Sequence, residues 1–232
     1  MKNFDNSYLT DKVRNIAGTD EAGRGPLAGP VVAAAVIFAS DLFIEGVNDS
    51  KKLSESQRER MYPLILEKCL SCSVSVVSNE EIDRINILQA SLLAMRNAVD
   101  GLTVAPDIIL VDGNKGLNHS IKSIPIVKGD SKSFAIASAS IIAKVTRDRI
   151  MKELSLLHPQ YLWSKNKGYP TKEHIALVKE FGPSRYHRVT FLKNFFPEDY
   201  LLSYCHPRPQ IIGDPMNGKD SILNYDPKPE AV

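Results

Sequence analysis

Hydrophobic and polar residues follow one another in short blocks that predict alternating strands and helices. Five blocks of four to eight residues are predicted as strands, most of them because they are largely apolar or alternate apolar and polar residues. Turn-forming residues such as Gly, Pro, Asn and Asp stand beside most of these blocks. The predicted strands span residues 13–20, 31–38, 72–77, 107–111 and 124–127.

The first helix signal lies between the second and third predicted strands. Ser54 and Gln57 have the spacing of a capping box, which predicts a helix that begins there. We expect Pro63 to kink or interrupt this helix, because proline has no N–H to donate within a helix. Cys69 and Cys72 have the spacing of zinc and redox sites, but no second Cys/His pair stands at a suitable distance. We therefore interpret them as small residues between a helix end and a strand.

Three further helices follow. Ser78 and Glu81 repeat the capping pattern ahead of a helix that runs to about Val99. A long helix is predicted over 131–157, where many small residues permit close packing against a sheet, and a short one over 171–181. Two strands, then alternating helices and strands, then helices indicate an α/β fold whose sheet includes some antiparallel pairing.

Composition excludes several classes of protein. The 232 residues are 43% hydrophobic and 24% charged, with a net charge of +2, which is too apolar and too close to neutral for a disordered chain. No apolar run reaches the roughly 18–20 residues that cross a membrane, and the N-terminus lacks the apolar core of a secretory signal. We therefore expect a cytoplasmic protein without membrane association. Three cysteines, an odd number, argue against a disulfide framework.

Charge and proline content divide the chain into parts. Residues 122–193 carry 14 Lys and Arg against 5 Asp and Glu. This basic surplus indicates a surface that faces a polyanion, although a solvated face would have the same composition. We expect a core over 13–157 and a small helical appendage over 158–200. A proline-rich tail over 201–232 is expected to be extended or disordered.

A glycine-rich turn follows the first predicted strand. Its sequence GTDEAGRGPLAGP is similar to a dinucleotide-binding loop, but Pro26, Pro30 and the β-branched run after them leave no helix N-terminus for a pyrophosphate. The adjacent acids Asp20 and Glu21 precede the glycines, at a strand end where no helix dipole is available to them. Both can serve one site only if the chain bends there, since neighbours in a strand point to opposite faces.

Two more acids stand at comparable places. Asp112 ends a predicted strand, and Asp130 precedes the long helix. Carboxylates from strand ends and a helix start can converge on one edge of a sheet, and an oxygen-rich cluster without sulfur suits Mg²⁺ or Mn²⁺. Each acid also has a structural interpretation, Asp130 as a helix cap and Asp112 with Gly113 as a turn. Asp148, with lysines four residues away on both sides, is interpreted as a surface ion-pair residue.

Five motifs in this order resemble those of the bacterial ribonuclease HII family. They are GTDEAGRGPLAGPVVA from Gly18, NDSKKL from Asn48, VDG from Val111, KGDSK from Lys128 continuing into ASASIIAKV, and NKGY from Asn166 followed by GPS. The resemblance covers about residues 15–192. It implies a ribonuclease H-like catalytic core, with a mixed five-stranded sheet flanked by helices, and a small C-terminal helical region that binds substrate. It further implies cleavage of the RNA strand of RNA–DNA hybrids and of DNA duplexes 5′ to an embedded ribonucleotide, leaving 3′-hydroxyl and 5′-phosphate ends.

The resemblance also implies roles for individual residues. The carboxylates that would be catalytic and hold two divalent ions, Mn²⁺ or Mg²⁺, are Asp20, Glu21, Asp112 and Asp130. The turn that would sense the 2′-hydroxyl consists of Gly23, Arg24 and Gly25, and Tyr169 would stack on the deoxyribose after the ribonucleotide. Candidate phosphate contacts are Lys51, Lys52, Lys132, Arg185, His187 and Arg188. The expected partners are RNA–DNA hybrid and ribonucleotide-containing duplex DNA, bound by a monomer.

The sequence departs from the family near its C-terminal motif. After GPS the usual continuation is close to Pro-x-His-Arg-Arg-Ser-Phe, whereas this chain has Val189 for one arginine and gains Arg185. Another metal nuclease or strand-transfer enzyme of the same fold would lack the Gly-Arg-Gly turn and Tyr169. A non-catalytic hybrid-binding module would have lost an acid. A sliding clamp would be reached through the tail, but residues 210–212 are too fragmentary to predict a clamp motif.

Overall fold

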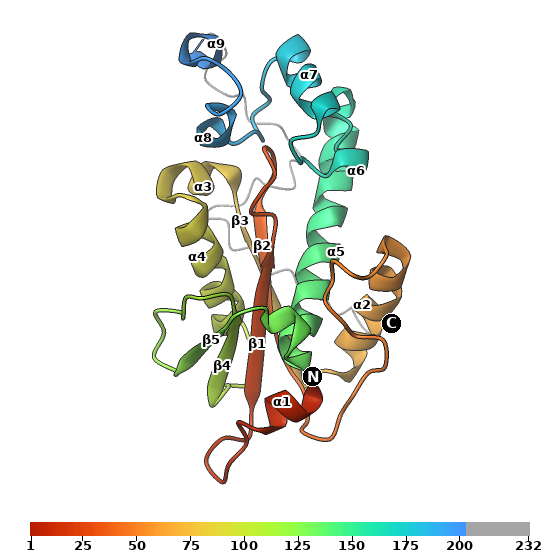
Figure 1. The fold of residues 1–232 in the computed structure, drawn as a ribbon, viewed down its shortest axis with the longest axis vertical. Helices are drawn as coiled ribbons and strands as arrows, with labels where there is room; N and C mark the ends of the chain where they lie inside the picture. Colours follow the sequence, from red (N-terminus) through yellow and green to blue (C-terminus); the bar gives the residue numbers. More distant parts are fainter. Residues whose placement is uncertain (203–232) are drawn as a thin grey trace.

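The computed structural model describes residues 1–202, which form a five-stranded sheet with helices on both faces (Figure 1). The strands are β1 (Ile16–Ala22), β2 (Val31–Ile37), β3 (Ser71–Val77), β4 (Ile108–Asp112) and β5 (Ser123–Ile126). The helices are α1 (Lys2–Asn6), α2 (Glu55–Lys68), α3 (Asn79–Ile85), α4 (Ile87–Asp100), α5 (Phe134–Leu157), α6 (Trp163–Asn166), α7 (Lys172–Phe181), α8 (Val189–Leu192) and α9 (Glu198–Leu202). Two short 3₁₀ turns are η1 (Gly129–Ser131) and η2 (Pro159–Tyr161). No helix within residues 1–202 combines the length and the apolarity needed to cross a membrane.

The sheet is mixed, which confirms the predicted fold class. Its strand order is β3-β2-β1-β4-β5. The strand β2 pairs antiparallel with both β1 and β3, whereas β4 and β5 continue the sheet parallel to β1. Parallel neighbours end at the same edge of a sheet, so the C-terminal ends of β1 and β4 lie together.

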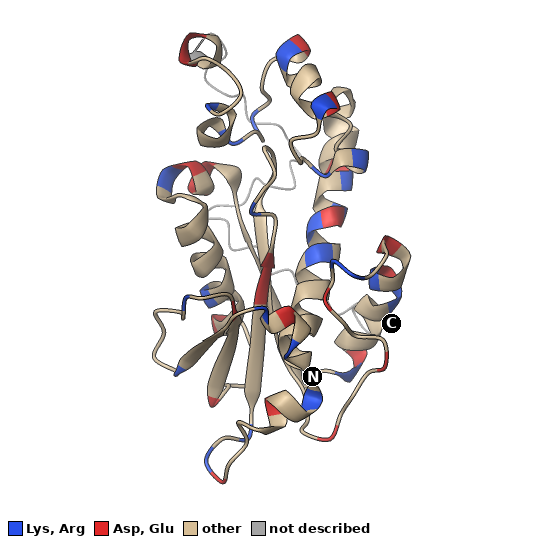
Figure 2. Ribbon diagram, in the orientation of Figure 1, with Lys and Arg blue, Asp and Glu red and all other residues tan. Residues whose placement is uncertain are grey.

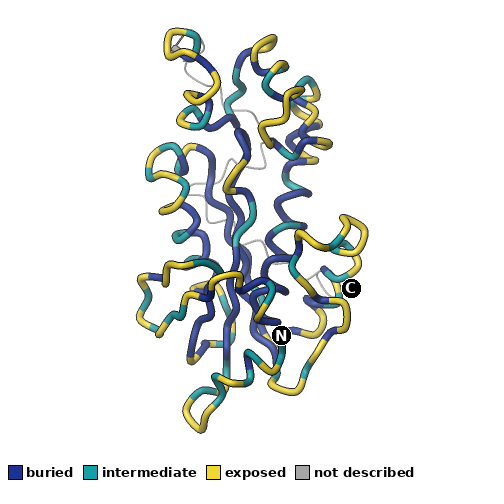
Figure 3. The backbone as a smooth tube through the Cα atoms, viewed as in Figure 1, coloured by how far each residue is buried: buried dark blue, intermediate teal, exposed yellow. Residues whose placement is uncertain are grey.

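The strand β2 is buried on both faces. Val32 and Ala34 pack against α2 and α5, whereas Val31 and Ala33 pack against α4. This double burial explains the uninterrupted apolar run in the sequence, because neither face needs polar residues. The buried interior follows the sheet and the inner side of α5 (Figure 3).

The helix α5 lies very close to β1. A Cβ added at Gly18 would be 2.3 Å from the carbonyl carbon of Ala135 and 2.4 Å from the backbone nitrogen of Ile136. Glycine is therefore required where the first turn of α5 crosses the strand, and the small residues of α5 continue the contact. Ser133 caps this helix by accepting a hydrogen bond from the N–H of Ile136.

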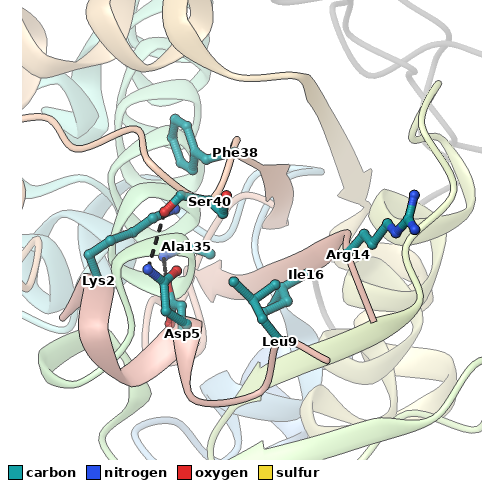
Figure 4. Close-up of a pocket in the computed structure, with 9 residues that line it drawn as sticks. Lys2, Asp5, Leu9, Arg14, Ile16, Phe38, Ser40 and Ala135 are labelled. Atoms are coloured by element: carbon teal, nitrogen blue, oxygen red, sulfur yellow. Dashed lines mark hydrogen bonds between the residues drawn. The ribbon is translucent and has the colours of Figure 1, made fainter. Parts of the chain in front are cut away.

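The N-terminal helix α1 is attached to the same end of α5 (Figure 4). Asp5 Oδ2 accepts a hydrogen bond of 2.9 Å from the N–H of Ala135, and Lys2 Nζ donates one of 2.7 Å to the carbonyl of Ala39. Burial raises the pKa of Asp5 above its usual value. Beside it is a cavity of about 10 Å³, about the space that one water molecule requires.

The segment after α5 does not pack by itself. Its aromatic cluster, built around Trp163 and Tyr186, includes Leu27 from the glycine-rich turn and Met151 and Leu154 from α5. The predicted boundary at 157/158 therefore crosses a shared hydrophobic core. The predicted tail lies outside the described residues, apart from its first two, which end α9.

Several element boundaries differ from the sequence-based expectation. The first strand begins at Ile16, later than expected, and continues to Ala22. The helix α2 continues through Pro63, where we expected a kink or an interruption. The single helix expected from Ser78 is two helices, because Asn86 adopts a positive φ of 68° and its side chain then caps α4. Cys69 and Cys72 stand at the end of α2 and within β3, as interpreted.

We expect Gly18→Ala to destabilise the protein by about 1–3 kcal/mol or more, because the added methyl group would overlap backbone atoms of α5. Urea unfolding should show a lower midpoint with an unchanged slope. Gly25→Ala is the matched control, since a Cβ there meets its nearest atom at 3.7 Å and should change stability by less than about 0.5 kcal/mol. Equal midpoints for the two variants would contradict this packing.

Candidate active site

Acidic residues gather where β1 and β4 end (Figure 2). The register pairs Thr19 with Val111 across the parallel strands, so the next residues along each strand, Asp20 and Asp112, become neighbours. Glu21 also lies within β1, and it lines the same cleft as Asp20 although the two are neighbours in the strand. All three acids line one cleft of about 310 Å³.

Asp20 is the most buried of these acids, with 4% of its surface exposed. Burial raises the pKa of Asp20 well above its usual value, and the like charges of Glu21 and Asp112 raise it further. Hydrogen bonds from Ser140 and from the N–H of Glu21 act in the opposite direction. Burial likewise raises the pKa of Glu21, although Arg24, 3.3 Å away, partly counteracts it.

Asp112 connects the sheet to the turn that carries Asp130. Its Oδ1 accepts hydrogen bonds from the N–H groups of Gly129 (2.6 Å) and Asp130 (3.3 Å). Burial and the charge of Asp130 raise the pKa of Asp112. Asp130 does not cap α5, because Ser133 does, and its carboxylate instead pairs with Lys51 Nζ at 3.3 Å. Its alternative interpretation as a helix cap is therefore wrong.

The donor set suits a hard divalent cation, although the side chains are not yet arranged around one. Within residues 1–202, no three His, Cys, Asp or Glu side chains surround a common point as metal ligands. Two of the acids, Glu21 and Asp130, are paired with Arg24 and Lys51 instead. A cluster of carboxylates that raise one another's pKa is, however, what a divalent ion with oxygen ligands stabilises. The residues therefore fit Mg²⁺ or Mn²⁺ by their chemistry.

The Gly-Arg-Gly turn (Gly23, Arg24 and Gly25) and Tyr169 line the same cleft as Asp112. A Cβ at Gly25 would be 3.7 Å from the Tyr169 ring, so the ring stands directly beside the turn. Tyr169 is 40% exposed, and Lys144 lies 5.9 Å from the ring centroid. An open aromatic face thus adjoins the acidic cluster.

The candidate phosphate contacts do not share one environment. Lys51, Lys52 and Lys132 are exposed, and Arg185 is half-buried beside the Tyr186 ring. His187 and Arg188, in contrast, are fully buried, so the expectation that they contact phosphate is wrong for this structure. Both are held by hydrogen bonds inside the protein.

His187 belongs to a buried aromatic network. Its Nδ1 accepts a hydrogen bond from the N–H of Ser184, and its Nε2 lies 3.2 Å from Nε2 of His174. Trp163 Nε1 donates to the same His174 nitrogen, while His174 Nδ1 lies 2.9 Å from the Tyr169 carbonyl oxygen. The network therefore supports the loop that carries Tyr169.

Sequence reasoning missed the structural importance of Arg147 and misplaced Asp148. Asp148 is buried and pairs with Lys144 at 2.7 Å, rather than lying on the surface. Arg147 is fully buried and donates hydrogen bonds to the carbonyls of Ala28 and Pro30. A signal was present, because Arg147 stands four residues after Ala143 in a stripe of small and apolar residues on the inner side of α5.

Comparisons with known proteins agree on one family. A family model described as Ribonuclease HII matches residues 17–194. A curated Ribonuclease HII from Ruminiclostridium cellulolyticum is 51% identical over 195 residues, which cover 84% of this chain and 76% of that protein. An RNase HII from Archaeoglobus fulgidus, solved in complex with PCNA, is 27% identical with a TM-score of 0.65, covering 78% of this chain and 95% of that one.

A more distant structure supports the fold alone. Bst-RNase HIII, solved in complex with Mn²⁺, is 20% identical with a TM-score of 0.60 over 82% of this chain and 70% of that chain. The family match, by contrast, spans the sheet, the acidic cluster, the Gly-Arg-Gly turn and Tyr169. The chain therefore belongs to the ribonuclease HII family and is a ribonuclease H enzyme, active on RNA–DNA hybrids.

Proposed function

We propose that this enzyme also nicks duplex DNA on the 5′ side of a single embedded ribonucleotide, leaving 3′-hydroxyl and 5′-phosphate ends. One observation carries the proposal: the acidic cluster, the Gly-Arg-Gly turn and the exposed Tyr169 ring line the same cleft. A single ribonucleotide offers one 2′-hydroxyl followed by a deoxyribose. A glycine turn that admits close approach and an adjacent aromatic face are the groups that such a step requires.

The four carboxylates would hold two divalent ions, Mn²⁺ or Mg²⁺. The support is the mutual repulsion of Asp20, Glu21 and Asp112 in a buried, oxygen-only donor set. The fold-related RNase HIII was solved with Mn²⁺. Such ions supply an activated water and neutralise the charge that develops on the phosphate and the leaving oxygen. At present Glu21 and Asp130 pair with Arg24 and Lys51, and the ions would compete with these cationic side chains for the carboxylates.

Side chains of this protein would then orient the substrate. Lys51 reaches from Asp130 to the surface, with 79% of its side chain exposed, and so can meet a phosphate beside the cleavage site. Lys52, Lys132 and Arg185 remain candidates for phosphates farther along the duplex, contacts that position without reading sequence. We expect the partner to be nucleic acid, bound by a monomer. A sliding clamp would be reached through the tail, which lies outside the described residues apart from its first two.

We expect Asp20→Asn to lower incision at a single ribonucleotide by more than about 100-fold, a larger loss than a change beyond the metal ligands usually causes. Duplex binding should stay within a few-fold of wild type, because the phosphate contacts remain. Gel assays of incision and fluorescence anisotropy measure the two effects. Asp11→Asn, at an exposed turn position that does not line the cleft, is the control, and normal cleavage by Asp20→Asn would refute the metal assignment.

The same substitution should stabilise the metal-free protein at neutral pH. Folding raises the pKa of Asp20, so its favourable contribution is complete below the unfolded value of about 3.9 and is lost as the pH rises through the folded value. The melting temperature of Asp20→Asn should therefore exceed that of wild type increasingly from about pH 4 upward, by about 2–4 °C for each kcal/mol gained. Thermal melts in EDTA test this, and a constant difference at every pH would contradict it.

We expect Tyr169→Ala to reduce cleavage at a single ribonucleotide about tenfold more than cleavage of a long hybrid, a difference of about 1.4 kcal/mol. A long hybrid offers many positions for cleavage. Cleavage at a single ribonucleotide, in contrast, depends on the contact between the Tyr169 ring and the deoxyribose that follows. Tyr169→Phe keeps the ring and should behave like wild type on both substrates. Parallel kcat/KM measurements decide the matter, and equal losses on both substrates would exclude this role of the ring.

A further inference from the structure

Two buried arginines hold the glycine-rich turn by its carbonyl groups. Arg188, with none of its surface exposed, donates four hydrogen bonds of 2.7–3.1 Å to the carbonyls of Gly23, Arg24, Gly29 and Pro30. Arg147 donates three of 3.0–3.1 Å to the carbonyls of Ala28, Pro30 and Lys167. The two guanidinium groups therefore meet at the Pro30 oxygen and fix the turn from both sides.

Burying two charged guanidinium groups costs free energy, so their presence needs an explanation. Taking a charge out of water costs several kcal/mol, and within residues 1–202 neither arginine makes an ion pair with an acid. Burial lowers the pKa of Arg147 to about 10, so it stays charged at neutral pH. Apolar side chains would fill the same space at lower cost but could not orient carbonyl groups.

The direction of those carbonyls determines the direction of the next N–H groups. In a planar trans peptide, the C=O of one residue and the N–H of the next point in opposite directions. Because the carbonyls of Gly23 and Arg24 point at Arg188, the N–H groups of Arg24 and Gly25 point away from it. Neither N–H donates a hydrogen bond to any residue in the described part of the chain. Both residues line the cleft that holds the acidic cluster.

We propose that Arg188 is a positioning residue for substrate recognition: it directs the N–H groups of Arg24 and Gly25 into the cleft as donors for the 2′-hydroxyl oxygen of the ribonucleotide. This inference rests on the proposed function. Arg188 itself is too buried to touch nucleic acid, and so acts only through the turn. Two donors held by a rigid support lose little entropy when they bind an oxygen, which is why their direction affects recognition.

Arg147 connects the same turn to the aromatic wall of the cleft. It binds the carbonyl of Lys167, two residues before Tyr169, and its guanidinium lies 6.0 Å from the Tyr169 ring centroid. Glycine at position 23 is part of this contact, since a Cβ there would lie 2.2 Å from Arg147 Nε. Arg147 thereby fixes the distance between the turn, which carries the donors for the ribose, and the Tyr169 ring, which would meet the following sugar.

The test uses Arg188→Lys, which keeps the charge but cannot reach four carbonyls. Two quantities are measured: kcat/KM on a duplex with one ribonucleotide, and the inhibition constant of the matching all-DNA duplex as competitor. We expect kcat/KM to fall at least about tenfold while the inhibition constant stays within about twofold, because phosphate contacts are unchanged. Arg149→Lys is the control on the same helix as Arg147, since Arg149 contacts Glu59 and Tyr62 instead of the turn. It should change neither quantity.

If Arg188 had a purely structural role, its substitution would lower kcat/KM and raise the inhibition constant together, or would change neither. Either result would overturn the inference. If Arg188→Lys does not fold, as judged by its thermal melt, Arg188→Gln is measured in its place, and retention of wild-type discrimination there would likewise refute the inference. Wild-type protein that fails to incise at the ribonucleotide would refute the proposed function itself. That failure is seen before any variant is compared.

Discussion

Hydrogen bonds from two buried guanidinium groups to main-chain carbonyls hold together the parts of the protein that face the cleft. Arg147 comes from α5, Arg188 comes from the segment after it, and both end on the turn that follows β1. Without them the carbonyls of this turn would be buried without partners, at a cost of about 1–3 kcal/mol for each group. The glycines of the turn follow from the same contacts. A side chain at Gly23 would collide with Arg147, and one at Gly29 would collide with Met151.

The acidic cluster has a different physical origin. Strand register makes Asp20 and Asp112 neighbours, and a hydrogen bond from the backbone of Asp130 to Asp112 adds a further carboxylate. Like charges and burial then raise the pKa of three of these acids. Favourable packing elsewhere in the fold offsets this repulsion, as in the close contact of α5 with β1 at Gly18. An active-site arrangement that lowers the stability of the empty protein is common among enzymes.

The apolar pattern was sufficient to predict the strands. The predicted strand ends then indicated which acidic residues could form a site. The short, β-branched run from Val31 predicted a buried strand, and the strand is buried along its whole length. The pattern could not show that Arg188 is buried, because an arginine beside aromatic residues looks the same in sequence whether it faces solvent or carbonyl groups. Nor could it show the break at Asn86, which depends on a single positive φ. Both are decided by contacts between distant segments.

The shared hydrophobic core of the turn and the C-terminal segment has a consequence for synthesis on the ribosome. All four acids lie within the first 130 residues, whereas Arg188 and most of the aromatic cluster that encloses Leu27 come later in the chain. Chains emerge N-terminus first, and domains generally fold as units. The turn after β1 can therefore take its final shape only once the C-terminal segment has been made, although the turn itself is among the first parts to be synthesised.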